Sequence, residues 1–108
     1  GRDLRINVVG NHEVASMYRY STKGDFRSNI TLGGQMERYQ PSKEQIDMAI
    51  KACKVVGLDF GGVDLLFGEA DAPIVCEVNS NPHFKTTYDC TGINLAESII
   101  EYIKRKCI

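Results

Sequence analysis

The sequence has no long apolar run, no closely spaced cysteine pair and almost no net charge, and each absence excludes a class of protein. No stretch is long enough to span a membrane. A formal net charge of −1 gives no bulk attraction for nucleic acid or for an anionic surface. The four cysteines are widely and unevenly spaced, without the Cys-x-x-Cys pairs of a zinc site. We therefore expect a cytoplasmic protein with reduced thiols, without membrane association or direct nucleic-acid binding.

The start of the sequence lacks an initiator Met and the apolar stretch of a signal peptide. The 108 residues, 43% of them hydrophobic, suffice for one domain with a single core and are too few for two. Strand-like alternation begins almost at the first residue. We expect one domain over residues 1–108 that is a piece of a longer protein. The sequence shows no internal repeat and no low-complexity segment.

Alternating side chains near the N-terminus predict a β-hairpin. Leu4, Ile6 and Val8 would share one face of its first strand, and Arg5 and Asn7 the other. A turn at residues 10–12 and a returning strand over 13–20 complete it. Residues 21–35 read as a long polar loop, and long ordered loops are often functional. A short strand over 36–40 follows.

A capping box made by Ser42 and Gln45 predicts a helix from about 42 to 56, which Gly57 ends. Strands are expected over about 60–67 and 74–79, and a last helix from Asn94. The expected fold class is α+β: an antiparallel β-sheet with helices packed on one face.

Two carboxylates and a carboxamide stand at spacings that suit a metal site. Glu77 and Asn79 share one face of their strand, and an antiparallel pairing of Phe67 with Ile74 would place Asp64 directly opposite Glu77. Gly62 would then lie opposite Asn79 and leave space beside the ligands. Three oxygen ligands in so small an area suit Mg²⁺, which commonly accompanies phosphates. The alternative is a solvated polar face on a sheet that buries only its other side, and the spacing alone leaves both open.

The motifs on these strands resemble a known family. Gly61-Gly62-Val63-Asp64 with the segment from Pro73 to Pro82 resembles the C-terminal metal-binding half of an ATP-grasp ligase. The segments at 1–5, 24–29, 33–34 and 91–96 extend the resemblance to the RimK-like branch, which contains amino-acid ligases. The likeness runs over nearly the whole chain with its spacing intact. It implies the C-terminal lobe of an ATP-grasp fold.

Such enzymes activate a carboxylate as an acyl phosphate, which an amine then attacks to form an amide, with release of ADP and phosphate. The resemblance therefore implies ATP and Mg²⁺ as cofactors, with two ions expected and Mn²⁺ as an alternative metal. It makes Asp64, Glu77 and Asn79 the metal ligands. The implied partners are a carboxylate substrate, an amino-acid amine and the remainder of the enzyme.

The resemblance also assigns residues to the nucleotide. Arg27 matches the position that reaches the transferred phosphate and is the implied catalytic residue, because a planar guanidinium grips two oxygens at once. Asp3, Ser28 and Asn29 match nucleotide-contacting positions. On residue type alone, Arg27 reads as an exposed loop arginine, Asp3 as a strand-entry residue and Asn29 as a turn former.

Two further assignments carry plain alternatives. Leu66 shares a face with Asp64 and would help to seat the adenine, or it is ordinary core. Asn81 would contact substrate or phosphate, although Asn-Pro is also a normal strand exit.

The sequence departs from the family pattern in two respects. Many relatives have glycine after the proline, where this chain has His83, so the substrate is open. The small lobe that supplies lysines to adenine and phosphates is missing, and there is no Gly-x-x-x-x-Gly-Lys loop. We expect the isolated chain to lack ligase activity. The alternative is a standalone, degenerate domain that binds a divalent metal or a partner without catalysis.

Overall fold

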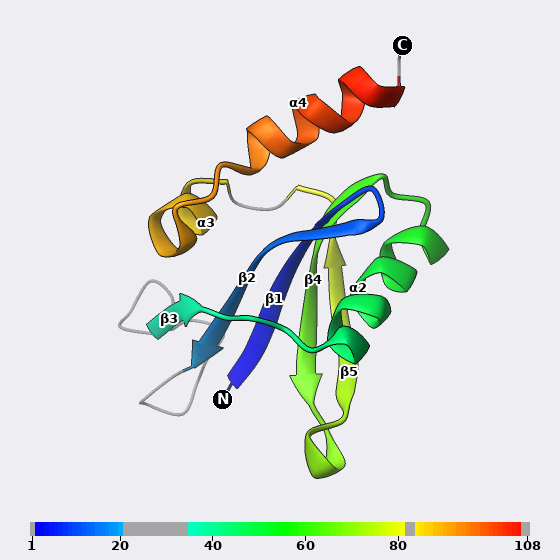
Figure 1. Ribbon diagram of the computed structural model, residues 1–108. Helices are drawn as coiled ribbons and strands as arrows, with labels where there is room; N and C mark the ends of the chain where they lie inside the picture. The colour runs from blue at the N-terminus through cyan, green and yellow to red at the C-terminus, as the bar shows by residue number, and fades with distance from the viewer. Residues whose placement is uncertain (1, 21–34, 82–83, 107–108) are drawn as a thin grey trace.

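The computed structural model describes residues 2–20, 35–81 and 84–106 of the chain. Figure 1 shows a twisted sheet with one helix against its face and two further helices beyond one end. In chain order the elements are β1 (Arg2–Val9), β2 (His12–Tyr20), β3 (Gln35–Arg38), α2 (Lys43–Val55), β4 (Phe60–Phe67), the 3₁₀ turn η1 (Glu69–Asp71), β5 (Pro73–Asn79), α3 (Phe84–Thr91) and α4 (Leu95–Lys106).

The five strands form one antiparallel sheet in the order β3-β2-β1-β4-β5. β1 lies at its centre and pairs with β2 on one side and β4 on the other. The predicted α+β class with an antiparallel sheet is confirmed, and so are the N-terminal hairpin and the strand pair β4–β5. No helix in the described part of the chain is long and apolar enough to cross a membrane.

The apolar core lies between the sheet and α2. Leu4, Ile6 and Val8 of β1 point to this side, where each is at most 1% exposed. They pack with the buried apolar residues of β4 and α2, which are Val63, Leu65, Ala49 and Cys53. The period of two along β1 and β4 therefore assigns one complete face of the central strands to the core.

Helix α2 begins and ends where its sequence signals predict. The Ser42 side chain accepts a hydrogen bond from the Gln45 backbone N–H, and the Gln45 side chain accepts one from the Ser42 backbone N–H. These two bonds satisfy backbone donors that the first turn leaves open. Gly57 follows the last turn with φ +79°, a left-handed conformation that glycine adopts without strain.

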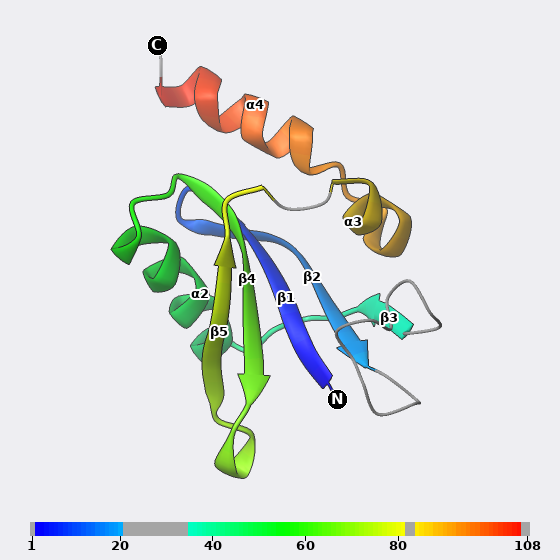
Figure 2. The ribbon, with the colours of Figure 1, turned by 180° about the vertical axis from the view of Figure 1, so that it is seen from behind.

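Helices α3 and α4 lie beyond one end of the sheet (Figures 1 and 2) and contact, near that end, the side that faces away from α2. The predicted packing of helices on one face holds for α2, and α3 and α4 reach the opposite side. Leu95 and Ile99 of α4 meet Val9 and Phe60 there, and Thr87 of α3 meets Asn7. The sequence reasoning missed α3, which has eight residues and several threonines. Its one helical signal is the ion pair between Lys85 and Asp89 at i,i+4 spacing.

Candidate metal centre

Two transverse rows of residues cross the polar face of the sheet. In the first row Arg5 of β1 pairs with Asp64 of β4, and Asp64 pairs with Glu77 of β5. In the second row Asn7 pairs with Gly62, and Gly62 pairs with Asn79. The predicted pairings of Asp64 with Glu77 and of Gly62 with Asn79 are therefore confirmed. Directly opposed side chains project from the same face of a sheet.

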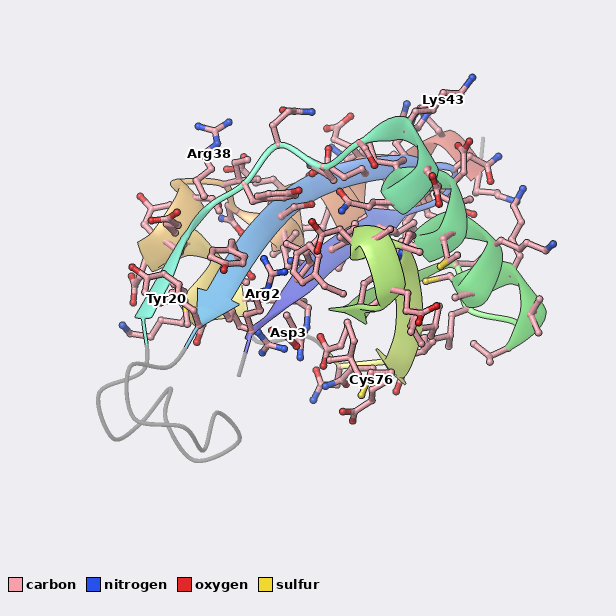
Figure 3. All side chains as sticks on the ribbon, turned by 90° about the horizontal axis from the view of Figure 1, so that it is seen from below. Arg2, Asp3, Tyr20, Arg38, Lys43 and Cys76 are labelled. Atoms are coloured by element: carbon pink, nitrogen blue, oxygen red, sulfur yellow. The ribbon has the colours of Figure 1, made fainter. Side chains whose placement is uncertain are left out.

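The strand pairing that was expected to produce this register is wrong by one residue. Phe67 pairs with Pro73, and not with Ile74, because the register shifts between Asp64 and Leu65. Across that shift the partner changes from Glu77 to Val75, so Cys76 is the additional residue of a β-bulge. Only the part of β5 that follows the bulge has the expected register. Cys76 is exposed on this edge strand (Figure 3).

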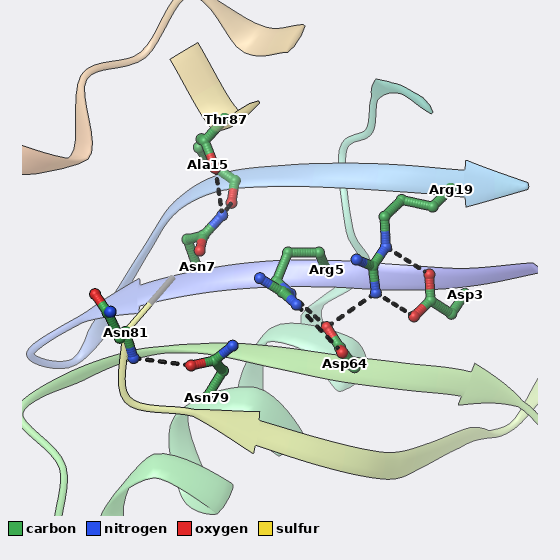
Figure 4. A network of polar contacts seen from close by, with 9 residues as sticks. All are labelled: Asp3, Arg5, Asn7, Ala15, Arg19, Asp64, Asn79, Asn81 and Thr87. Atoms are coloured by element: carbon green, nitrogen blue, oxygen red, sulfur yellow. Dashed lines mark hydrogen bonds and ion pairs between the residues drawn. The ribbon is translucent and has the colours of Figure 1, made fainter. Parts of the chain in front are cut away.

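Asp64 is buried and bound by two arginines (Figure 4). Arg5 donates hydrogen bonds from Nε to Oδ1 and from Nη2 to Oδ2, the second at 3.3 Å. Nη2 of Arg19 lies 3.2 Å from Oδ1. The carboxylate is thus oriented by two guanidinium groups that are themselves largely buried, with side chains 9% and 14% exposed.

Asp3 completes the charged cluster from the start of β1. Its two oxygens accept hydrogen bonds from Nε and Nη2 of Arg19, the first at 2.8 Å, and the residue is only 1% exposed. Burial raises the pKa of the Asp3 carboxyl, while the hydrogen bonds and the charge of Arg19 act in the opposite direction. Both oxygens of Asp3 are therefore engaged within the protein. Its nucleotide contact stays a prediction.

Glu77 and Asn79 lie at the outer edge of the same face. Glu77 is exposed, and Asn79 is half-buried. Oδ1 of Asn79 accepts a hydrogen bond from the backbone N–H of Asn81 at 2.9 Å, which closes the exit of β5 as an Asx turn (Figure 4). Asn81 is exposed just beyond the strand, so its side chain is accessible.

Gly62 makes room for the side chains around the carboxylate. A Cβ at this position would lie 3.0 Å from Cδ of Arg5, and 3.2 Å from both Nη1 of Arg5 and Oδ1 of Asn7. Arg5 and Asn7 therefore occupy the space above the glycine. Asn7 donates to the Ala15 carbonyl and to Thr87, and its own Oδ1 has no hydrogen-bond partner in the described structure.

Arg5, Arg19 and Asn7 are the residues that sequence reasoning missed as parts of the site. A signal was present for two of them, because the alternation of β1 placed Arg5 and Asn7 together on the face opposite the core. Arg19 joins through its pairing with Asp3 across the hairpin. Long-range charge pairing of this kind leaves no local pattern.

The remaining predicted residues are divided between the sheet and an undescribed segment. Leu66 is half-buried near the far end of β4 and pairs with Ile74. Arg27, Ser28 and Asn29 lie outside the described residues, as does His83.

The donors present suit a hard divalent cation. Among the described residues no three His, Cys, Asp or Glu side chains converge on one point. A metal site here would therefore have to combine Asp64 and Glu77 with amide oxygen and with oxygens from outside the protein. Mg²⁺ fits this composition because it usually binds through one or two carboxylates plus water and phosphate oxygens.

Comparison with known proteins shows the family of this chain. The RimK-like ATP-grasp domain matches residues 1–103. The chain is 44% identical over 105 residues to a probable alpha-L-glutamate ligase 1 of Shewanella sp. (strain MR-4), covering 97% of this chain and 35% of that protein. A probable alpha-L-glutamate ligase of Methanococcoides burtonii is 42% identical with the same coverage. The chain spans about a third of the length of these relatives.

Solved structures share the fold at low sequence identity. The ATP-grasp ligase PsnB, complexed with a phosphomimetic variant of its minimal precursor, Mg and ADP, superposes with a TM-score of 0.80 at 18% identity, over 100% of this chain and 33% of PsnB. The D-alanine–D-alanine ligase of Bacillus anthracis complexed with ATP gives 0.68 at 18% identity, over 97% of this chain and 38% of that enzyme.

The five-stranded antiparallel sheet with its helices is thus a fold shared with solved ATP-grasp ligases. The chain belongs to the RimK-like ATP-grasp family.

Proposed function

We propose that this chain is the C-terminal metal- and ATP-binding part of an ATP-dependent carboxylate–amine ligase, which forms an amide bond through an acyl phosphate. The observation that supports it most directly is the row formed by Asp64 and Glu77, with Asn79 two residues further along the strand on the same face. Membership of the RimK-like ATP-grasp family gives this row its chemical context.

In this proposal Asp64, Glu77 and Asn79 hold Mg²⁺, expected as two ions. When bound, the metal neutralises the triphosphate and the charge that develops during phosphoryl transfer. The buried position of Asp64 removes water from one side of the site, whereas exposed Glu77 leaves the other side open to the nucleotide. Leu66 and Asp3 contribute to the nucleotide site.

Arg27 is the proposed catalytic residue, with Ser28 and Asn29 beside it in sequence. Its guanidinium would grip two oxygens of the transferring phosphoryl group. Asn81, exposed at the end of β5, is proposed to contact substrate. The amine substrate is an amino acid, and the relatives named as glutamate ligases make glutamate the first to test.

The test is the double change Asp64→Asn with Glu77→Gln in the full-length protein. We expect the rate of amide formation to fall by about 100-fold or more and to lose its dependence on Mg²⁺. Even the loss of an outer-shell partner of a metal lowers metal affinity or activity by about 10- to 100-fold. Turnover is measured as ADP release with ATP, Mg²⁺ and glutamate.

The matched control is Asp71→Asn with Glu69→Gln, which makes the same chemical changes in the exposed 3₁₀ turn of the same β-hairpin. This control should keep wild-type turnover. Survival of turnover and Mg²⁺ dependence in the Asp64 and Glu77 double variant would disprove the metal assignment.

We also infer that residues 1–108 by themselves lack ligase activity, because the chain spans only about 35% of its relatives. Robust ADP release by this piece alone, with ATP, Mg²⁺ and an amino acid, would contradict that inference.

A further inference from the structure

A buried network of four charges lies on the polar face of the sheet. Asp3, Arg19, Asp64 and Arg5 are joined in that order by the contacts described above (Figure 4). The two arginines and two aspartates balance in charge. Burying four charges costs desolvation free energy, so the network must be compensated by its internal contacts. Those contacts indicate the role of each member.

The contacts use up most of the acceptor capacity of Asp64. An ionised carboxylate offers about four lone-pair positions, two on each oxygen. Oδ1 receives Nε of Arg5 and faces Nη2 of Arg19, and Oδ2 receives Nη2 of Arg5. Contacts among the described residues leave one position, and it is on Oδ2. Asp64 can therefore offer one oxygen to a cation without giving up an arginine.

Other residues of the sheet fix the positions of the two arginines. Asp3 binds Arg19 through both of its oxygens. Arg5 lies across Gly62, where the missing Cβ gives its side chain room. Because these supports are buried, Asp64 has little freedom to turn both oxygens toward a cation.

We propose that Arg5 and Arg19 are positioning residues that restrict Asp64 to coordination through one oxygen, and that the centre thereby discriminates against Ca²⁺. Mg²⁺ requires near-ideal octahedral geometry with six short bonds. Ca²⁺ accepts six to eight longer ones and often takes a carboxylate through both oxygens. A carboxylate locked in one-oxygen coordination fits Mg²⁺ and denies Ca²⁺ an additional ligand. This inference rests on the proposed function, which makes Asp64 a metal ligand.

The experiment measures metal selectivity in the full-length protein, independently of turnover. Bound Mn²⁺ is followed by electron paramagnetic resonance in the presence of ADP, and Mg²⁺ or Ca²⁺ is added until half of the Mn²⁺ is displaced. The ratio of the Ca²⁺ to the Mg²⁺ concentration needed is the readout. In Arg5→Met we expect this ratio to fall by about tenfold, the lower end of the effects of outer-shell changes at metal sites.

Arg5→Lys separates the geometry of the guanidinium from its charge. Lysine keeps the positive charge but has no planar fork that can bind both oxygens. We therefore expect the ratio to fall in Arg5→Lys as well. Arg2→Met is the matched control, because Arg2 binds Asp71 in an exposed ion pair on the same strand as Arg5. The control should keep the wild-type ratio.

An unchanged ratio in both Arg5 variants would overturn the inference, and so would a fall in Arg5→Met that Arg5→Lys restores. If Arg5→Met does not fold, as judged by circular dichroism, Arg5→Lys decides alone. Asp64→Asn identifies the other kind of failure. If Mn²⁺ binding is unaffected by that change, the metal site of the proposed function is wrong, whatever the Arg5 variants show.

Discussion

The two faces of the central strands β1 and β4 are formed by alternate residues of the same short segments, and they differ in chemistry: one is apolar and the other is charged. On one face Leu4, Ile6 and Val63 pack against α2 in a core that contains no charge. On the other face Asp3, Arg5 and Asp64 are also buried but are joined by ion pairs. Apolar burial stabilises without further conditions, whereas buried charges stabilise only while every partner is present.

The largest expected effect comes from removing one partner of the charged face. Arg19→Met leaves Asp3, which is 1% exposed, without its hydrogen-bond donor. We expect the free energy of unfolding to fall by about 3–5 kcal/mol, the range for breaking a buried pair. Urea unfolding of the full-length protein, followed by circular dichroism, measures the change.

This loss should depend on pH in a defined direction. Burial raises the pKa of Asp3, and without Arg19 the hydrogen bonds that oppose the rise are gone. A carboxyl with a raised folded-state pKa stabilises the fold most at low pH, and that contribution is lost as the pH rises through the folded pKa. The loss in Arg19→Met should therefore be smaller near about pH 4 than near about pH 7.

The control removes both charges at once. Asp3→Leu combined with Arg19→Met leaves no uncompensated carboxylate, and replacing a complete buried pair by apolar residues is often neutral. The double variant should regain most of the stability that Arg19→Met loses. If it is as unstable as the single variant, the charges do not explain the loss.

The apolar face should respond to a simple reduction in size. Leu65→Ala removes a side chain that is 1% exposed and leaves a cavity among its neighbours in the core. The expected loss is about 2–5 kcal/mol in the same unfolding experiment. The adjacent Leu66, half-buried on the opposite side of β4, is the matched control. Equal losses in Leu66→Ala and Leu65→Ala would show that the two faces do not differ as described.

The smallest expected effect comes from two neighbouring glycines of β4, Gly61 on one face of the strand and Gly62 on the other. A Cβ on Gly61 would lie 3.1 Å from the Asn79 carbonyl, and one on Gly62 would crowd Arg5 and Asn7. We expect Gly61→Ala and Gly62→Ala each to lower stability by about 1–3 kcal/mol, as overpacking does.

Gly62→Ala should also lower the Ca²⁺ to Mg²⁺ displacement ratio, because this change moves Arg5. Arg2→Met again serves as the control for this ratio. An unchanged ratio in Gly62→Ala would show that metal selection does not depend on the position of Arg5.

Local patterns were sufficient to predict most of the fold. The capping box of Ser42 and Gln45 located α2, and alternation located the strands and the core side of β1. The short helix α3 was missed because its threonines are poor helix formers. The shift by one residue at Cys76 was also missed, because a bulge depends on how two strands fit together and has no signal in either strand alone.

The candidate site divides in the same way. The periods of the strands and the family motifs identified Asp64, Glu77 and Asn79, and their register is as expected. The residues that orient Asp64 were not identified as such, since Arg19 comes from another strand and contacts both Asp3 and Asp64 only in the assembled sheet. The residues predicted in the loop around Arg27 stay predictions.

What the sequence determined by itself was therefore periodic and local: which residues form strands and helices, which side of each strand is apolar, and which oxygen donors stand two residues apart. Tertiary structure alone decided that Asp64 faces two arginines and has one oxygen position left. The physical reason is that a period of two assigns a side chain to a face, whereas its partners are set by strand order, register and burial. Those depend on residues far away in the sequence.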